Sequence, residues 1–165
     1  MEYEAALRER WDDLTSCVGE EVRNKWWAKI RDAYSETHRH YHTLEHLSLM
    51  FKFYDMYKDQ LNNRCSLMYA IFFHDIVCNL NSQSNPQDSS AVFAEFSKET
   101  TFDQVNSVRD LIEATNNCIP DASVTGRFGE DDVHYFMDFD IAVLASSPEG
   151  RASTIIIIDN DKCYF

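Results

Sequence analysis

The segment HRHYHTLEH, residues 38–46, contains four of the six histidines in the chain. Within it, His42 and His46 are four residues apart, so they share one face of a helix if that helix already includes His42. Imidazole nitrogens bind metal ions and carry protons near neutral pH. Taken alone, the spacing predicts either part of a reaction site or a solvated pair of surface histidines.

A second candidate pair follows a strongly apolar run. His74 and Asp75 come directly after SLMYAIFF, which predicts that they lie at the edge of the core. An ionised carboxylate there needs a partner, because burying an unpaired charge is costly. A divalent metal ion would satisfy Asp75 and the histidines together, since carboxylate and imidazole are common ligands. The alternative is that Asp75 caps a neighbouring helix or pairs with Arg39.

Two further carboxylates occur in MDFDIAVL, where the surrounding residues are almost wholly apolar. On a helix, Asp140 shares a face with apolar neighbours, whereas Asp138 lies about 200° away from it by the helical period. Asp140 is therefore the better candidate for an inward-facing ligand.

Together these residues resemble the HD superfamily of metal-dependent phosphohydrolases. Its H...HD...D pattern is filled by His46, His74, Asp75 and Asp140. YHTLEH looks like the YHNxxH segment of the cyclic-nucleotide phosphodiesterase branch. RHYHTLEHL, FFHDIVCN and MDFDIAVLAS are most similar to RHYHNLxH, WFHDxVY and LDxDLAILG of the small "predicted metal-dependent HD-superfamily phosphohydrolase" group. The resemblance extends from Trp26 to Ser146.

The resemblance implies a single divalent ion, Mn, Mg, Fe, Co or Zn, held by these four side chains. It also implies hydrolysis of a small phosphorylated substrate: a phosphomonoester, a phosphodiester or a nucleotide. His42 would be the general acid that protonates the leaving oxygen, and Asp75 would act at the reaction centre as well as on the metal. Arg39 would bind phosphate, because a guanidinium can grip it through two nitrogens.

Three departures from the group keep other functions open. Pro86 stands where the group has a glutamate, and Asp88 offers a carboxylate only from a different position. Cys118 replaces a histidine, and the ending after Ser146 differs from that of the group. The alternatives are an HD-fold protein that binds metal, ligand or partner without turnover, and a purely structural helical module with solvated histidines.

The elements that must position these residues are predicted to be helical throughout. Apolar residues recur at spacings of three and four, which predicts helices over residues 3–17, 20–35, 43–59, 64–77, 86–98, 102–116 and 131–145. Only TIIIIDNDKCYF at the end reads as a strand or an unpaired segment. We therefore expect an all-α HD-type bundle over residues 1–146, and an atypical tail over 147–165 that favours homo-oligomers.

The composition of the chain argues against some classes of binding partner. The chain has 165 residues, the length of one domain, with a formal net charge of -13. Such a charge argues against binding long nucleic acid, where basic residues must neutralise phosphates. There is no apolar leader and no run long enough to span a bilayer, and the five cysteines lack a CxxC pair. These features predict a cytoplasmic protein with reduced, mostly buried cysteines and no membrane partner.

Overall fold

The computed structural model describes residues 2–116 and 131–142, and over these ranges it contains helices and no strand. The elements are α1 (Glu2–Leu14), α2 (Glu20–Ala33), α3 (Leu44–Tyr57), the 3₁₀ turn η1 (Lys58–Gln60), α4 (Arg64–Phe73), α5 (Asn85–Lys98), α6 (Val105–Ala114) and α7 (Asp132–Ile141). The predicted all-α class is confirmed. The segment 117–129, the end of the last predicted helix and the tail lie outside the described residues.

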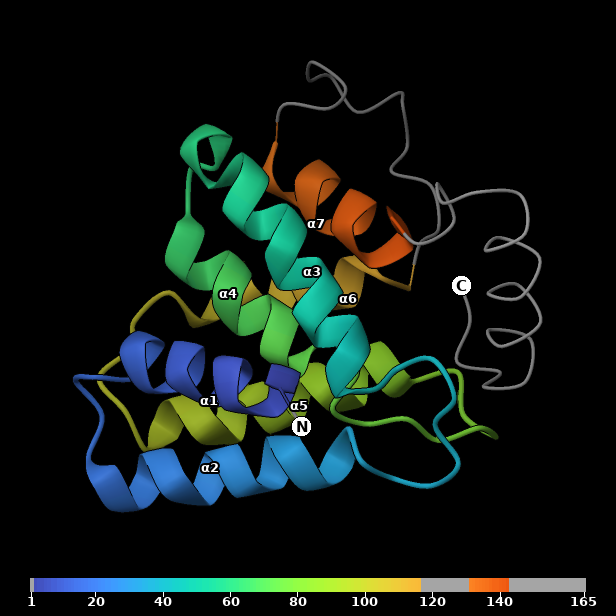
Figure 1. Cartoon of the computed structure of the whole chain (residues 1–165), viewed down its shortest axis with the longest axis horizontal. Coiled ribbons are helices and arrows are strands. Elements are labelled where there is room, and N and C mark those ends of the chain that lie inside the picture. The colour runs from blue at the N-terminus through green and yellow to red at the C-terminus, as the bar shows by residue number, and fades with distance from the viewer. Residues whose placement is uncertain (1, 117–130, 143–165) are drawn as a thin grey trace.

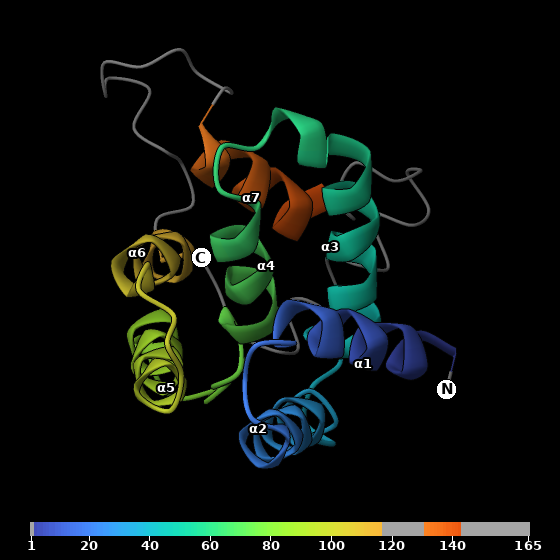
Figure 2. The ribbon, with the colours of Figure 1, turned by 90° about the vertical axis from the view of Figure 1, so that its left-hand side faces the viewer.

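The central element is α4, of whose ten residues seven are buried. Figure 2 shows it between α3 on one side and α5 and α6 on the other, and it contacts all three. Figure 1 shows α7 beside the upper part of α3, while α1 and α2 run below, and α7 contacts both α3 and α4. Because α4 is surrounded, the residue that ends it is held among several helices.

Aromatic side chains fill the core below the end of α4. Trp11 of α1 is fully buried, and its ring contacts those of Phe72, Phe73 and Phe96 with centroids 5.3, 6.1 and 5.4 Å apart. Its indole nitrogen donates to the carbonyl of Arg23, so the one polar atom of the ring is paired. This packing joins α1, α4 and α5 into a rigid support for the residues that follow α4.

The predicted helix boundaries hold at most ends, with one difference that matters for the site. Thr43 is the N-cap residue of α3, but its side chain makes no capping hydrogen bond. Pro86 lies in the first turn of α5, as predicted. The fourth helix ends at Phe73 instead of continuing to Val77. His74 is its C-cap residue, and the carbonyls of Asp75 and Ile76 beyond it accept hydrogen bonds from the side chain of Arg39.

A carboxylate at the start of α7 ties that helix to the turn before α4. Asp132 accepts hydrogen bonds from two successive backbone amides, those of Asn62 at 2.8 Å and Asn63 at 2.7 Å. Asn63 in turn caps α4, its side-chain oxygen accepting from the amide of Ser66. Asp132 therefore fixes α7 relative to α4.

We expect Asp132→Ala to lower the free energy of unfolding by about 1–3 kcal/mol, since it removes a charged acceptor shared by two amides. Urea denaturation measures the change. The matched control is Asp138→Ala, which removes an exposed carboxylate from the same helix. An equal loss in both variants would mean that the two amide bonds contribute nothing specific.

The described cysteines match the predicted buried, reduced thiols only in part. Cys17 and Cys65 are free, as predicted, but exposed, whereas Cys78 is buried, as predicted, but disulfide-bonded. Spacing along the chain cannot show which cysteines the fold exposes or brings together. No helix within the described ranges has both the length and the apolar composition needed to cross a membrane. The cytoplasmic location stays a prediction.

Candidate metal centre

Three helix ends bring the four predicted ligands together. His46 lies in the first turn of α3, His74 directly follows the last residue of α4, and Asp140 lies in the last turn of α7. With Asp75, each offers one ligand atom, and these four atoms all lie within 4.8 Å of one another. The cluster, His46, His74, Asp75 and Asp140, could hold a metal ion.

The contacts within the cluster run from imidazole nitrogen to carboxylate oxygen. The Nε2 atom of His46 is 3.0 Å from Oδ1 of Asp140, and Nε2 of His74 is 3.1 Å from Oδ2 of Asp75. The two Nε2 atoms are 3.4 Å apart. Two imidazoles and two carboxylates thus present ligand atoms to one small region, held by α3, α7 and the turn that follows α4.

The orientation of His74 suits a metal ligand. Its Nδ1 atom lies 2.9 Å from the carbonyl oxygen of Ile71, a contact that a proton on Nδ1 would make. That tautomer leaves Nε2 directed at the cluster, which is the arrangement usual for histidines that bind metal. The rings of Tyr34 and Phe136 lie on its flanks, with centroids 6.4 and 5.8 Å away.

The charges of the cluster favour a cation. Burial alone would raise the pKa of Asp75, but the positive charge of His74 outweighs it and lowers that pKa to about 2. Burial would likewise raise the pKa of Asp140, but bonds from His46 and His74 lower it well below its usual value. Both carboxylates are therefore ionised near neutral pH, where they need positive charge beside them.

The pKa values of His46 and His74 shift in opposite directions, although both side chains are buried. Burial lowers the pKa of His46 and favours its neutral form, the form that binds metal. For His74, burial also acts to lower the pKa, but the negative charge of Asp75 prevails and raises it well above the usual value. With one cationic histidine against two carboxylates, the cluster retains net negative charge. A divalent ion could take the place of the His74 proton, so the residues present fit a metal.

His42, the predicted general acid, lies beside the cluster but is not one of its four members. Its Nε2 atom is 3.4 Å from Oδ2 of Asp75, and the residue is buried. Its ring meets that of His46 edge to face, with centroids 5.6 Å apart. The structure thus separates the two histidines of YHTLEH, with His46 inside the cluster and His42 at its side.

The hydrogen bonds of Arg39 differ from those that the sequence predicted. Its guanidinium is fully buried, donates to the carbonyls of Asp75 and Ile76, and bonds the carboxylate of Glu36 at 2.9 Å. It therefore pairs with the backbone of Asp75 and not with its carboxylate. The predicted phosphate contact stays a prediction, since these bonds are all internal to the protein. His38 also has a structural contact, its Nε2 lying 3.0 Å from the carbonyl oxygen of Cys78.

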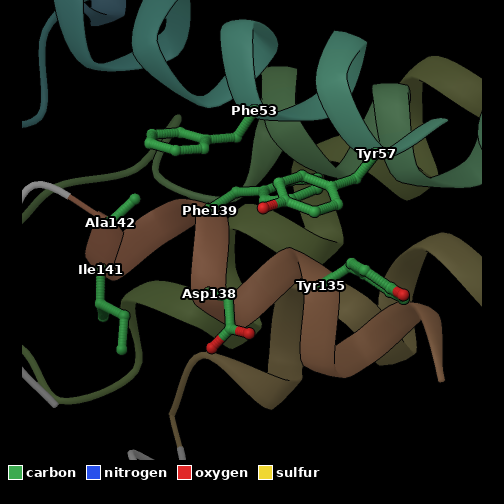
Figure 3. A pocket seen from close by; sticks show the side chains of 7 residues that line it. All are labelled: Phe53, Tyr57, Tyr135, Asp138, Phe139, Ile141 and Ala142. Atoms are coloured by element: carbon green, nitrogen blue, oxygen red, sulfur yellow. The ribbon is translucent and has the colours of Figure 1, made fainter. Parts of the chain in front are cut away.

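The helical period correctly separates the two carboxylates of α7. Asp140 is buried in the cluster, whereas Asp138 is exposed. Figure 3 shows the Asp138 side chain pointing away from α3; Asp138 is among the residues that line a pocket, together with Phe53 of α3 and Tyr135 of α7. Asp138 therefore provides a matched control for substitutions of Asp140.

Two tyrosines next to the cluster were missed by sequence reasoning. The hydroxyl of Tyr34 accepts a hydrogen bond from the amide of Asp75 at 3.1 Å, and burial raises its pKa to about 12. The hydroxyl of Tyr41 donates to the carbonyl of Asp140 at 3.1 Å, while its ring lies 4.6 Å from that of His46. Tyr41 was visible as the first letter of YHTLEH, but nothing in the sequence links Tyr34 to Asp75.

Comparisons of the chain with models of protein families, with curated proteins and with solved structures found no match in any of the three. The resemblance to the HD superfamily therefore remains a prediction from the motifs. What the structure adds independently is an all-helical fold with a buried His/Asp cluster that could hold a metal ion.

Proposed function

We propose that the protein is a metal-dependent hydrolase of a small phosphorylated compound, an HD-type phosphohydrolase. The observation that carries the proposal is the convergence of His46, His74, Asp75 and Asp140 from three helix ends, with their ligand atoms all within 4.8 Å of one another. The motifs that supply these positions resemble the HD pattern, which supports the proposal. A nucleotide is the default substrate by analogy with that superfamily alone.

In this proposal the four side chains hold one divalent ion, of the set Mn, Mg, Fe, Co and Zn. When bound, such an ion supplies Lewis-acid activation of water and of a phosphoryl oxygen. Imidazole and carboxylate ligands suit all five metals, so the ligand set does not choose among them. Because the four ligands lie at the ends of three packed helices, with His74 and Asp75 adjacent after α4, the core would keep their geometry before the ion arrives.

The reaction would take place on the side of the cluster formed by Asp75 and His42. The side chain of Asp75 is 16% exposed, against 1% and 0% for His46 and His74, so Asp75 marks the more open side. His42 lies next to it and can carry a proton to a leaving oxygen near Asp75. Asp75, as both ligand and neighbour of His42, would orient the imidazole toward the substrate.

Phosphate release from a panel of nucleotides and phosphoesters tests the proposal. We expect release that requires an added divalent ion and is lost in His74→Ala. Activity that survives His74→Ala would come from a contaminant. If the protein binds metal but releases phosphate from no compound of the panel, the hydrolase proposal is wrong.

A metal-binding protein without turnover is the second candidate, and one observation favours it. The glutamate that the HD group carries is Pro86 here, and the nearby carboxylate of Asp88 is exposed and bonded to the hydroxyl of Ser84 at 2.8 Å. Asp88 therefore does not replace the missing glutamate as an inward-facing base. Stoichiometric metal binding together with no phosphate release would select this candidate.

The raised pKa of His74 predicts how metal binding depends on pH. Below that pKa the proton on Nε2 competes with the ion, so affinity should rise with pH by close to tenfold per unit until the His74 pKa is passed. Binding near neutral pH should accordingly release close to one proton. Titration calorimetry in buffers of different ionisation enthalpy measures that proton. Affinity that does not change from pH 6 to 8 would mean that the ion displaces no proton from His74 in this range, which would contradict the raised pKa.

A further inference from the structure

The segment that carries His74 and Asp75 lies beyond the last residue of α4. The amides of His74 and Ile76 still bond backbone carbonyls of α4, but other backbone groups of the segment need partners outside regular structure. Side chains supply these hydrogen-bond partners at both ends of the segment. Ser89 accepts from the amide of Val77 at 3.1 Å, and Asn85 bonds both the amide and the carbonyl of Asn79, at 2.9 and 3.1 Å. These contacts hold the far end of the segment against α5.

The near end, at Asp75, is held by Tyr34 and Arg39. The hydroxyl of Tyr34 accepts from the Asp75 amide, and the guanidinium of Arg39 donates to the Asp75 carbonyl. Arg39 also donates to the carbonyl of Ile76 at 3.1 Å and lies over the ring of Tyr34, 5.2 Å from its centroid. Both polar backbone groups of a candidate metal ligand are thus bonded by two side chains that touch each other.

We infer that Tyr34 and Arg39 form a brace that positions Asp75 for metal binding, resting on the proposed function of the cluster. A planar guanidinium can reach two successive carbonyls at fixed angles, which a lysine ammonium cannot do in the same way. Glu36 bonds the same guanidinium and so neutralises the buried charge from the other side. Arg39 is therefore a positioning residue that acts through the backbone of Asp75, and neither brace residue needs to touch substrate.

The brace makes a different prediction from a phosphate contact at Arg39. If the guanidinium gripped phosphate, substitution would raise KM and leave metal affinity unchanged. If it positions a ligand, substitution should weaken metal affinity by about 10-fold, the size typical when a partner of a metal ligand is lost. The same loss should follow from a change at Tyr34, which the phosphate role would not explain.

The variants Arg39→Lys and Tyr34→Phe keep the charge and the ring respectively, so each removes chiefly the hydrogen bonds. Their matched controls are Arg31→Lys, a partly exposed arginine of α2, and Tyr54→Phe, a buried tyrosine of α3. Thermal unfolding followed by circular dichroism confirms that each variant folds. Tyr34→Phe is the milder change, so it keeps the test available if Arg39→Lys does not fold.

Two readouts decide the inference. The first is metal affinity by calorimetry with Mn²⁺, expected to fall about 10-fold in both brace variants and to stay unchanged in both controls. The second needs no metal: amide hydrogen exchange at residues 75–77, measured by NMR, should become up to about 10-fold faster in the brace variants. Unchanged exchange there in both variants, or unchanged metal affinity with a raised KM in Arg39→Lys, would overturn the brace. If the wild-type protein takes up no metal, the proposed function is wrong. The exchange rates at residues 75–77 would still show whether Tyr34 and Arg39 hold the backbone of Asp75.

Discussion

His42→Gln should lower the rate of phosphate release by about 10²–10⁴-fold while the protein keeps its metal, because that range is typical when one positioned proton donor is lost. His42 lies 3.4 Å from Asp75 but is not one of the four residues that share the metal cluster. Glutamine has a similar length and a polar end but cannot deliver a proton at neutral pH. The measurement is kcat for the best substrate of the panel, with metal content determined on the same sample.

The control for that experiment is a leaving group that needs no proton. A p-nitrophenyl ester has an acidic leaving group, so the defect of His42→Gln should shrink markedly on such a substrate. An equal loss on both substrates would mean that His42 has another role, such as orienting Asp75. A variant that loses its metal would place His42 among the ligands and contradict the separation seen in the structure.

Asp140→Asn should weaken metal binding by at least about 100-fold and abolish hydrolysis at ordinary metal concentrations. The carboxylate of Asp140 contacts Nε2 of His46 at 3.0 Å and Nε2 of His74 at 3.6 Å, so it joins both imidazoles of the cluster. The amide of asparagine has nearly the same shape but no charge, which isolates the electrostatic contribution. Calorimetric titration of both proteins gives the ratio of dissociation constants.

Asp138→Asn is the matched control, since it removes the same charge from the same helix at an exposed position. We expect its metal affinity to equal that of the wild type. Equal losses in the two variants would show that net charge, and not coordination, governs uptake. Asp140→Asn binding as tightly as the wild type would remove Asp140 from the ligand set.

The apolar patterns of the sequence predicted the separate candidates, and the resemblance to the HD pattern grouped His46, His74, Asp75 and Asp140 into one ligand set. The helical period placed Asp140 inward and Asp138 outward, and burial in the structure agrees. The apolar run before His74 predicted a central helix, and α4 is the most enclosed element of the described fold. These inferences work because packing of side chains leaves a periodic trace in the sequence.

The backbone contacts around Asp75 could not be predicted in the same way. Ile76 is buried and so extended the apparent pattern of α4, yet the chain leaves the helix at His74. Side chains make the hydrogen bonds there in place of helical ones. The guanidinium of Arg39 donates to the carbonyls of Asp75 and Ile76, and the hydroxyl of Tyr34 accepts from the amide of Asp75. Backbone groups leave no pattern in residue types, so Arg39 looked like a phosphate ligand and Tyr34 like an ordinary core residue.

The central claim is that His46, His74, Asp75 and Asp140 bind a metal ion. The most direct test is the metal content of the full chain, measured by mass spectrometry after incubation with Mn, Fe, Mg, Co or Zn in turn and removal of the excess. We predict one tightly held ion per chain for at least one of the five metals, lost in Asp140→Asn and retained in Asp138→Asn. A wild-type chain that takes up none of the five metals would contradict the claim.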